Sequence, residues 1–269
     1  MGEEKCWICG NIADSGEHRI KNSDLKLLFG SNIGKKGLLL FKENKVITLQ
    51  STNSKFIKSK ILCKSCNGNK TQPFDKAYEI FIKYIDINVK EIVHKRFIDF
   101  GKVYGDNFEE KQRNLYKYLV KNFGTQLAHH NHPIPQDMID LLDKKHFQTG
   151  LSISFAINEV ALNAYREKGI RSSVGNGSIM VNQSYVDGTS SALCYTYNIR
   201  YDWLEIYYYY NCEVNGSLGS TWIANNRFIY LGSSTNDNDI KLIRQYKLKK
   251  IKWFTLEQLK EIQKDDKSV

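Results

Sequence analysis

The chain has 269 residues, of which 41% are apolar and 25% are charged. This length can bury a sizeable core, and the composition is ordinary for a globular protein. The longest apolar runs fall well short of the roughly 18 residues of a membrane span, and no apolar segment follows the polar start at Met1. We therefore expect a cytoplasmic protein with no membrane partner, in which the cysteines stay reduced.

The formal net charge of +10 favours an anionic partner. Nucleic acid is the first candidate and the partner that we expect; an acidic membrane surface is the second candidate and is not the one we adopt. The alternative is a chain in which Lys is simply common, as Asn and Ile also are. Charge by itself therefore gives weak support for either partner.

Two Cys-x-x-Cys pairs predict a metal site. They are Cys6 with Cys9 and Cys63 with Cys66. Each spacing puts two thiolates on one tight turn, and zinc accepts four thiolates in a closed structural site. Two such pairs, in a chain with only two other cysteines, favour structural zinc over the alternative of buried or redox-active thiols. Cys194 and Cys212 lie in strand-like contexts, where we expect buried, reduced side chains.

Three residues beside the cysteine pairs suit phosphodiester hydrolysis. Glu17 and His18 follow the first pair, and Asn67 comes directly after the second. A neutral imidazole can activate water because its pKa lies near working pH. A hard divalent ion such as Mg²⁺ or Mn²⁺ prefers oxygen ligands, which the Glu17 carboxylate and the Asn67 carbonyl provide. A zinc clip would hold these two distant segments in register.

The order Cys-x-x-Cys, Glu-His, Leu-Cys-x-x-Cys-Asn-x-x-Lys resembles the HNH endonucleases, whose catalytic unit is the ββα-metal fold. The resemblance covers residues 1–85. It implies that His18 is the general base and that Glu17 and Asn67 are catalytic residues that hold a divalent ion.

The chain departs from the family pattern at two places. The middle Asn of the motif is absent from Phe56 to Leu62, although Asn53 lies a few residues earlier. Lys21 stands where the family usually has Pro. These departures leave open a weakened or inactive nuclease, which would make the protein a zinc-containing nucleic-acid-binding protein without catalysis.

Lysines recur near the second cysteine pair. We assign phosphate contacts to Lys58, Lys60, Lys64 and Lys70. Clustered ammonium groups make binding to nucleic acid dependent on salt. For any one of these lysines, a solvated surface position is the alternative.

Helices are expected in the middle of the chain. Pro73 and Asp75 suit the first turn of a helix that continues past residue 85. Apolar spacing predicts a second helix over about 108–130 and a short one over 137–145. His129, His130 and His132 follow the second helix, and we interpret them as loop residues rather than metal ligands, because two prolines follow and no cysteine lies nearby.

The chain reads as β-rich from about residue 150. Strands are expected at 38–50 and, from residue 150, in segments rich in aromatic and β-branched residues between Gly, Asn and Ser turns. The segment 151–164 suits either a strand or a helix. The four tyrosines at 207–210 suit a packed sheet, with base stacking as the alternative. The segment 241–253 suits a basic strand or a phosphate-binding element, and 255–263 a closing helix.

The sequence thus predicts an α+β protein with three regions. Residues 1–100 would form an N-terminal zinc-stapled ββα-metal (HNH) module with its trailing helix, 101–149 a helical linker, and 150–269 an antiparallel β-rich domain with a terminal helix. The expected function is a metal-dependent endonuclease that cleaves DNA, most readily double-stranded, in restriction, phage defence or a mobile element. A nuclease subunit that acts only in a complex, as a homodimer or with a partner bound to the C-terminal region, is a further alternative.

Overall fold

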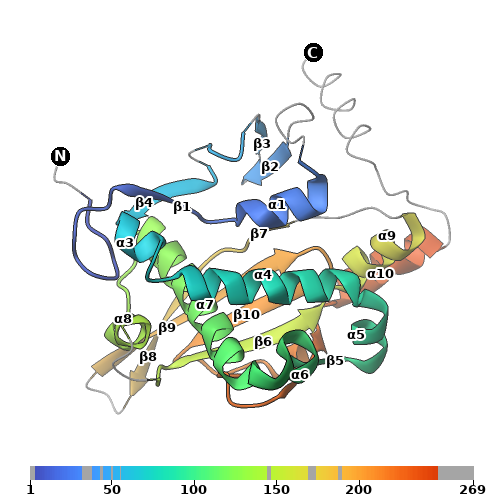
Figure 1. The fold of residues 1–269 in the computed structure, drawn as a ribbon. Helices are drawn as coiled ribbons and strands as arrows, with labels where there is room; N and C mark the ends of the chain where they lie inside the picture. Colours follow the sequence, from blue (N-terminus) through green and yellow to red (C-terminus); the bar gives the residue numbers. More distant parts are fainter. Residues whose placement is uncertain are drawn as a thin grey trace.

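The computed structural model describes residues 4–31, 38–42, 45–49, 51–54, 56–143, 147–168, 174–186 and 190–247 (Figure 1). Its first half contains β1 Ser15–His18, α1 Asn22–Phe29, β2 Leu38–Lys42, β3 Lys45–Leu49, β4 Lys58–Leu62, α3 Lys64–Asn67, α4 Gln72–Ile87, α5 Val89–Lys95, β5 Phe97–Asp99, α6 Phe100–Tyr104 and α7 Phe108–His129. Its second half contains α8 Gln136–Leu142, β6 Leu151–Ile157, α9 Glu159–Lys168, β7 Val174–Asn176, β8 Met180–Val186, β9 Ser190–Tyr201, β10 Leu204–Tyr210, β11 Phe228–Tyr230, β12 Gly232–Ser233 and α10 Asp237–Lys247. The predicted mixture of helices and sheet is confirmed.

The main sheet has the strand order β12-β6-β10-β9-β7, and β8 also pairs with β9. β6, β10 and β9 are antiparallel neighbours, so that Tyr208 lies between Ile153 and Tyr197. β12 adds to the edge of β6 in the parallel direction. These strands are rich in aromatic and β-branched residues, which fit the pleated and half-buried surface of a sheet.

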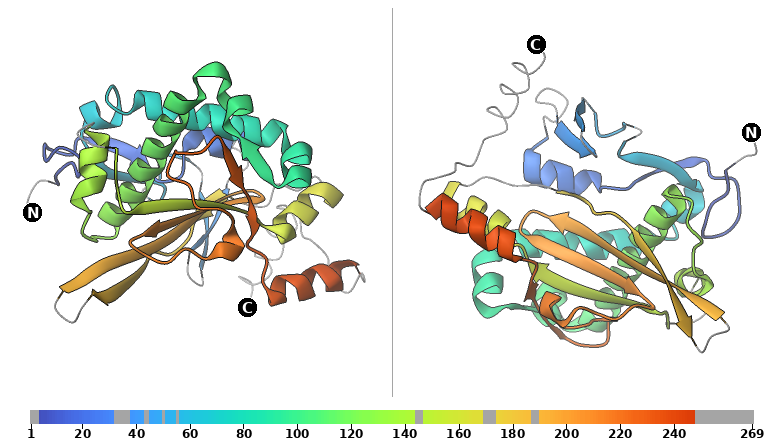
Figure 2. Two further views of the ribbon diagram at one scale, coloured as in Figure 1. Left: turned by 90° about the horizontal axis from the view of Figure 1, so that it is seen from below. Right: turned by 180° about the vertical axis from the view of Figure 1, so that it is seen from behind.

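α4 and α7 cover one face of this sheet (Figure 2). The Phe81 ring of α4 lies 5.7 Å from the Phe155 ring of β6, and the Phe123 ring of α7 lies 5.5 Å from the Tyr208 ring of β10. The two helices contact each other through Tyr78 and Tyr118, whose rings stack at 3.9 Å. Such aromatic contacts add to the free energy gained by burying apolar area.

One hydrophobic core joins the helices, the sheet and the N-terminal elements. Its buried side chains extend along the chain from Cys6 to Leu231 and come from all three predicted regions. β5 pairs with β11, so that Ile98 lies opposite Ile229. The N-terminal elements that carry the candidate site are therefore packed against the rest of the protein.

The predicted helix over 108–130 is confirmed as α7, and the helix after Asn67 is confirmed as α4, with Pro73 in its first turn. In the segment 151–164 both alternatives occur in succession, because β6 ends at Ile157 and α9 begins at Glu159. The strand pair expected at 38–50 is present as β2 and β3.

The basic strand expected from residue 241 is wrong, because this segment belongs to α10. The Asn236 side chain accepts a hydrogen bond from the Asp239 amide at 3.0 Å, which satisfies a free donor at the start of this helix. Arg244 and Lys247 lie in the last turn, where the helix dipole favours cations. Residues 248–253 and the closing helix expected at 255–263 lie outside the described residues.

The predicted packing of the four tyrosines at 207–210 is confirmed most clearly for Tyr208. Tyr208 is fully buried between Phe123 and Tyr197. Tyr209 and Tyr210 are also buried. Three of the four tyrosines are thus inaccessible to a nucleic-acid base.

The expectation that Cys194 and Cys212 stay reduced is wrong, because the two residues form a disulfide. β9 and β10 pair antiparallel, with Tyr195 opposite Tyr210, and this register brings the two cysteines to a Cα–Cα distance of 5.3 Å. Such a separation suits a disulfide. In the described part of the chain, no helix combines the length and the apolar character that a membrane crossing requires.

Candidate metal centre and the adjoining pocket

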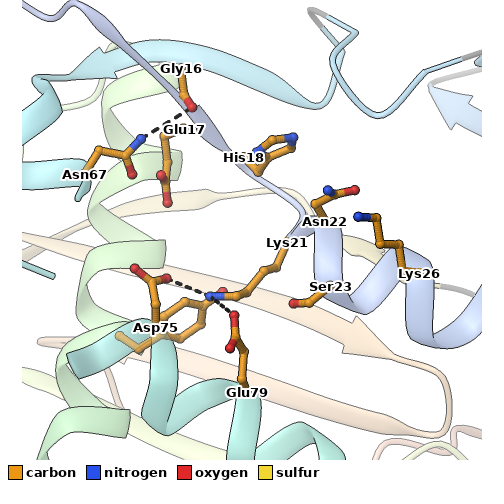
Figure 3. Close-up of a pocket in the computed structure, with 11 residues that line it drawn as sticks. Gly16, Glu17, His18, Lys21, Asn22, Ser23, Lys26, Asn67, Asp75 and Glu79 are labelled. Carbon is orange, nitrogen blue, oxygen red and sulfur yellow. Dashed lines mark hydrogen bonds and ion pairs between the residues drawn. The ribbon is translucent and has the colours of Figure 1, made fainter. Parts of the chain in front are cut away.

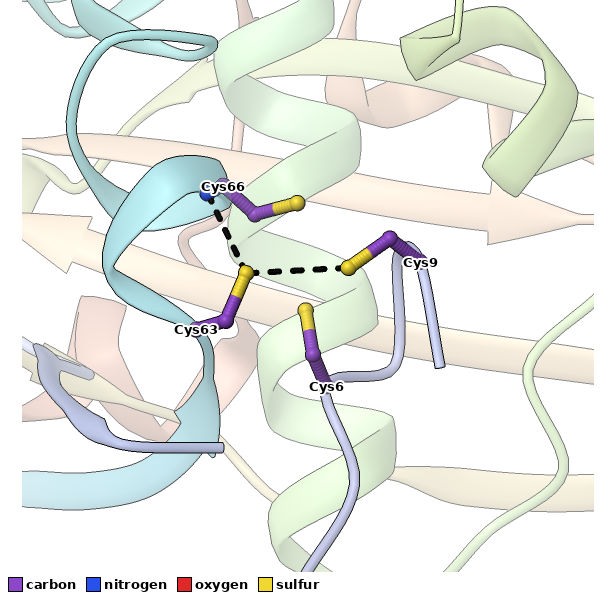
Figure 4. Close-up of side chains that lie close together, drawn as sticks. All are labelled: Cys6, Cys9, Cys63 and Cys66. Carbon is purple, nitrogen blue, oxygen red and sulfur yellow. Dashed lines mark hydrogen bonds between the residues drawn. The ribbon is translucent and has the colours of Figure 1, made fainter. Parts of the chain in front are cut away.

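The four cysteines of the two pairs meet in one cluster (Figure 4). All four sulfurs lie within 4.8 Å of one another, and Sγ of Cys9 is 3.6 Å from Sγ of Cys63. Zinc–sulfur bonds of about 2.3 Å in a tetrahedron would place the sulfurs about 3.8 Å apart. The thiols therefore fit a metal such as zinc, as the sequence predicts.

Local backbone geometry forms each half of this cluster. In the first pair, the Gly10 amide donates to the Cys6 carbonyl at 2.8 Å, and Gly10 has a φ of 76°, which glycine adopts most readily. In the second pair, Cys63 precedes α3 and its sulfur accepts from the Cys66 amide. Each turn directs two thiols toward the same point.

The cluster joins the segment that precedes β1 to α3. β1 pairs antiparallel with β4, with Glu17 opposite Ser59 and His18 opposite Lys58. Asn67, at the end of α3, donates from Nδ2 to the Ser15 hydroxyl at 2.8 Å. The sequence-predicted residues Glu17, His18 and Asn67 are thereby placed on adjacent elements.

These three residues line one pocket of about 450 Å³ (Figure 3). Lys21 and Asp75 also line this pocket. Successive side chains of a strand point to opposite faces. Glu17 and His18 are neighbours on β1, so their side chains diverge. In Figure 3, Glu17 lies between His18 and Asn67, and the imidazole is turned away from the Asn67 amide.

His18 has the properties of a neutral imidazole. Burial lowers its pKa, and the nearby Lys58 ammonium lowers it further. Its Nε2 atom is buried and has no hydrogen-bond partner among the described residues. At neutral pH this nitrogen is therefore able to accept a proton.

Two residues that the sequence analysis did not assign to the site complete the surroundings of Glu17. Lys121, on α7, places its Nζ 3.1 Å from Oε1 of Glu17 and 3.3 Å from Oδ2 of Asp75. The same Nζ is 3.5 Å from Oδ1 of Asn67. Burial raises the pKa of the Glu17 carboxyl, and the Lys121 ammonium opposes that increase. In the sequence Lys121 looks like any Lys of an amphipathic helix, and Asp75 like a residue that suits a helix start.

Lys21 occupies the position at which a Pro was expected from the family resemblance. Its Nζ is 2.8 Å from Oδ1 of Asp75 and 3.3 Å from Oε1 of Glu79. It also lies 5.1 Å from the centre of the Tyr118 ring. Asp75 is therefore held between two ammonium groups, those of Lys21 and Lys121.

The four lysines predicted to bind phosphate have different surroundings. Lys60 is exposed, and the Lys64 side chain is 80% exposed and 3.4 Å from Asp14. Lys70 forms an ion pair with Asp143. Lys58, which lies opposite His18 in the β1–β4 pair, donates to Oδ1 of Asn53 at 3.3 Å. Asn53, the residue considered as a substitute for the middle Asn of the motif, therefore contacts Lys58.

The three clustered histidines do not form a metal site. His129 ends α7, and its Nδ1 is 2.8 Å from the Ser59 hydroxyl. The ring of His130 is 5.0 Å from that of His129 and 6.4 Å from that of His132. Within the described ranges, the four cysteines are the one group of three or more His, Cys, Asp or Glu residues whose ligand atoms lie close enough for a metal.

Comparisons with models of protein families, with curated proteins and with solved structures found no match to this chain. Its function must therefore be inferred from the cysteine cluster and the pocket beside it.

Proposed function

We propose that the protein is a metal-dependent endonuclease of the HNH type that hydrolyses phosphodiester bonds in DNA, with structural zinc on its four cysteines. The observation that carries this proposal is a single pocket that contains a neutral imidazole and several oxygen donors directly beside the thiol cluster. The pairing of β1 with β4, followed by α3 and α4, supports a ββα-metal unit in which α1, β2 and β3 are inserted between the two strands.

His18 is the general base in this proposal. A base must be unprotonated to take a proton from water, and the lowered pKa of His18 keeps the imidazole neutral at pH 7. Its Nε2 has no competing hydrogen bond from the described residues. For hydrolysis, a water molecule must reach this buried nitrogen, give a proton to it and attack the phosphorus atom, while the bond from phosphorus to one ester oxygen breaks and that oxygen leaves with the cleaved strand.

Glu17 and Asn67 would hold a divalent ion, with Asp75 as a third oxygen donor. Their oxygens suit a hard cation, and they already converge, since all three contact the same Nζ of Lys121. When bound, Mg²⁺ or Mn²⁺ would offset the negative charge that develops on the phosphate. Asn67 is also tied to β1 through Ser15, which keeps its carbonyl near Glu17.

Double-stranded DNA is the proposed substrate. The net charge of +10 favours a polyanion, and Lys60 and Lys64 are exposed on the segment that leads to Asn67. Ammonium groups near the pocket would contact phosphates on either side of the scissile one. Restriction, phage defence and mobile elements are settings that such an enzyme would serve.

The test is cleavage of plasmid DNA by the His18→Ala variant in Mg²⁺ or Mn²⁺. Cleavage should disappear while the zinc content stays the same, because His18 is not a thiol ligand. His94→Ala is the matched control, since His94 is exposed on α5, which does not line the pocket. Wild-type protein that cleaves neither single- nor double-stranded DNA with either ion would contradict the proposal.

A non-catalytic, zinc-containing nucleic-acid-binding protein is the second candidate. Two observations favour it: the imidazole is turned away from Asn67, and an ammonium already contacts the oxygens of Glu17 and Asn67. Such a protein would slow the migration of DNA in a gel at low salt, even with EDTA present, and would form no cleavage products. A nuclease that needs a homodimer or a partner protein would instead gain activity on addition of that partner.

A further inference from the structure

Lys121 is a buried cation that contacts three of the residues that line the pocket. Only 1% of its side chain is exposed, although Glu17, Asn67 and Asp75 all line the pocket. Its three oxygen partners come from three different elements, namely β1, α3 and α4. A residue of α7 therefore connects every oxygen donor that the proposed function assigns to the divalent ion.

The ammonium of Lys121 has the donors that this position requires. An ammonium carries three N–H donors and no acceptor, and three oxygens lie between 3.1 and 3.5 Å from Nζ. Two of them belong to carboxylates, Glu17 and Asp75, which repel each other when both are charged. A buried positive charge between them compensates that repulsion, which is also what a bound metal ion does.

We propose that the Lys121 ammonium is an internal cation that takes the place of the divalent ion at Glu17, Asn67 and Asp75 and thereby weakens binding of that ion. The inference rests on the proposed function for the assignment of these oxygens as ion ligands. Mn²⁺ bound to the same oxygens would lie close to the ammonium, and the two positive charges would repel each other, with little screening of the ammonium because it is buried. The hydrogen bonds of Lys121 also occupy lone pairs that the ion needs.

Contact with the DNA phosphate is not a role for this lysine. Its side chain is covered by the residues that form the pocket wall, so a phosphate in the pocket would meet Glu17 and Asp75 first. Lys21 is different, because it lines the pocket and contacts Asp75 from that side. Lys121 is a positioning residue that acts through the oxygens it contacts.

The experiment compares Mn²⁺ affinity in Lys121→Gln and wild type, by calorimetry and by electron paramagnetic resonance, with the full zinc-loaded chain and without DNA. Gln keeps hydrogen-bond donors but has no charge. Removing one positive charge at this distance should tighten the dissociation constant of Mn²⁺ by about tenfold or more. An unchanged or weaker affinity would overturn the inference and leave Lys121 with a purely supporting role.

Lys111→Gln is the matched control. Lys111 lies on the same helix, and its ammonium donates to the Tyr104 carbonyl at 3.2 Å, away from the pocket. Its substitution should leave Mn²⁺ affinity unchanged. Circular dichroism and zinc content establish whether each variant is folded.

Lys121→Arg keeps the inference testable if Lys121→Gln does not fold. Arg retains the positive charge, so its Mn²⁺ affinity should be no tighter than that of wild type, and a tighter affinity would overturn the inference. Because no step involves DNA, the measurement distinguishes a failure of this inference from a failure of the nuclease proposal. A protein that fails to cleave DNA can still show the Mn²⁺ effect, and an active nuclease can lack it.

Discussion

The hydroxyl of Tyr78 donates a hydrogen bond of 2.7 Å to Oδ2 of Asp24, and both residues are buried. Tyr78 lies on α4 and Asp24 in the first turn of α1, so this bond joins the helix that follows Asn67 to the helix that follows His18. Burial raises the pKa of Asp24 to about 7, against an ordinary value of 3.8.

Asp24→Asn should make the protein more stable at neutral and alkaline pH. The folded protein keeps a proton on Asp24 that the unfolded chain releases, so folding becomes less favourable as pH rises from the ordinary pKa toward 7. Asn is uncharged and keeps an oxygen that can accept from Tyr78. The gain in the free energy of unfolding should be absent near pH 4 and reach at most about 4 kcal/mol at pH 8.

Urea denaturation of both proteins at several pH values measures this difference. Asp106→Asn is the control, because Asp106 is exposed and its substitution removes no buried carboxyl. A stability difference between wild type and Asp24→Asn that stays constant from pH 4 to pH 8 would show that folding does not change the pKa of Asp24.

Cys63→Ser should remove the metal and loosen the pocket. The Cys63 sulfur lies 3.6 Å from that of Cys9 and accepts a hydrogen bond from the Cys66 amide. Because a structural zinc contributes its binding free energy to folding, we expect about one zinc per chain in wild type, loss of that zinc in the variant, and a lower melting temperature.

Metal analysis by mass spectrometry and thermal melting test this prediction. Cys212→Ser is the matched control for loss of a cysteine, since its partner Cys194 lies outside the cluster. The control should retain zinc. If purified wild-type protein binds no zinc and its four clustered cysteines oxidise in pairs, the cluster is a redox site instead.

The double variant Lys60→Gln/Lys64→Gln should bind DNA more weakly and with less dependence on salt. Each phosphate contact that is lost should lower the slope of log affinity against log salt by about one. Lys70 pairs with Asp143 and Lys58 with Asn53, so these two should matter less. Fluorescence anisotropy at several salt concentrations gives both quantities.

The control for this pair is Lys83→Gln/Lys90→Gln, which removes the same charge from exposed positions near the other end of α4. If Lys60 and Lys64 contact phosphates, only their double variant should change the slope of log affinity against log salt. Equal effects of the two double variants would mean that DNA responds to the total charge of the protein and not to a defined surface.

Local features of the sequence were sufficient to predict several elements of the structure. α4 follows from Pro73 and Asp75 in its first turn and from apolar residues at helical spacing, and α7 follows from the same spacing. The cysteine pairs also form as predicted, because two thiols three residues apart already share a turn. In each case the determining contacts lie within a few residues along the chain.

The segment after residue 236 shows where local patterns do not decide. The alternation of basic and apolar residues from residue 241 fits a strand as well as a helix, and residues 241–247 belong to α10. Cys194 and Cys212 show a second limit, because their disulfide depends on the register between β9 and β10. That register is set by the packing of the whole sheet.

The sequence by itself was therefore sufficient to predict the thiol cluster and to name Glu17, His18 and Asn67 as candidate site residues. The tertiary structure alone decided that Lys121 and Asp75 belong beside them and that the His18 imidazole is turned away from Asn67. The physical reason is that these contacts join α7 to β1, α3 and α4 across one shared core. The residues around a charged side chain on a helix do not indicate which buried carboxylate it will contact in the folded protein.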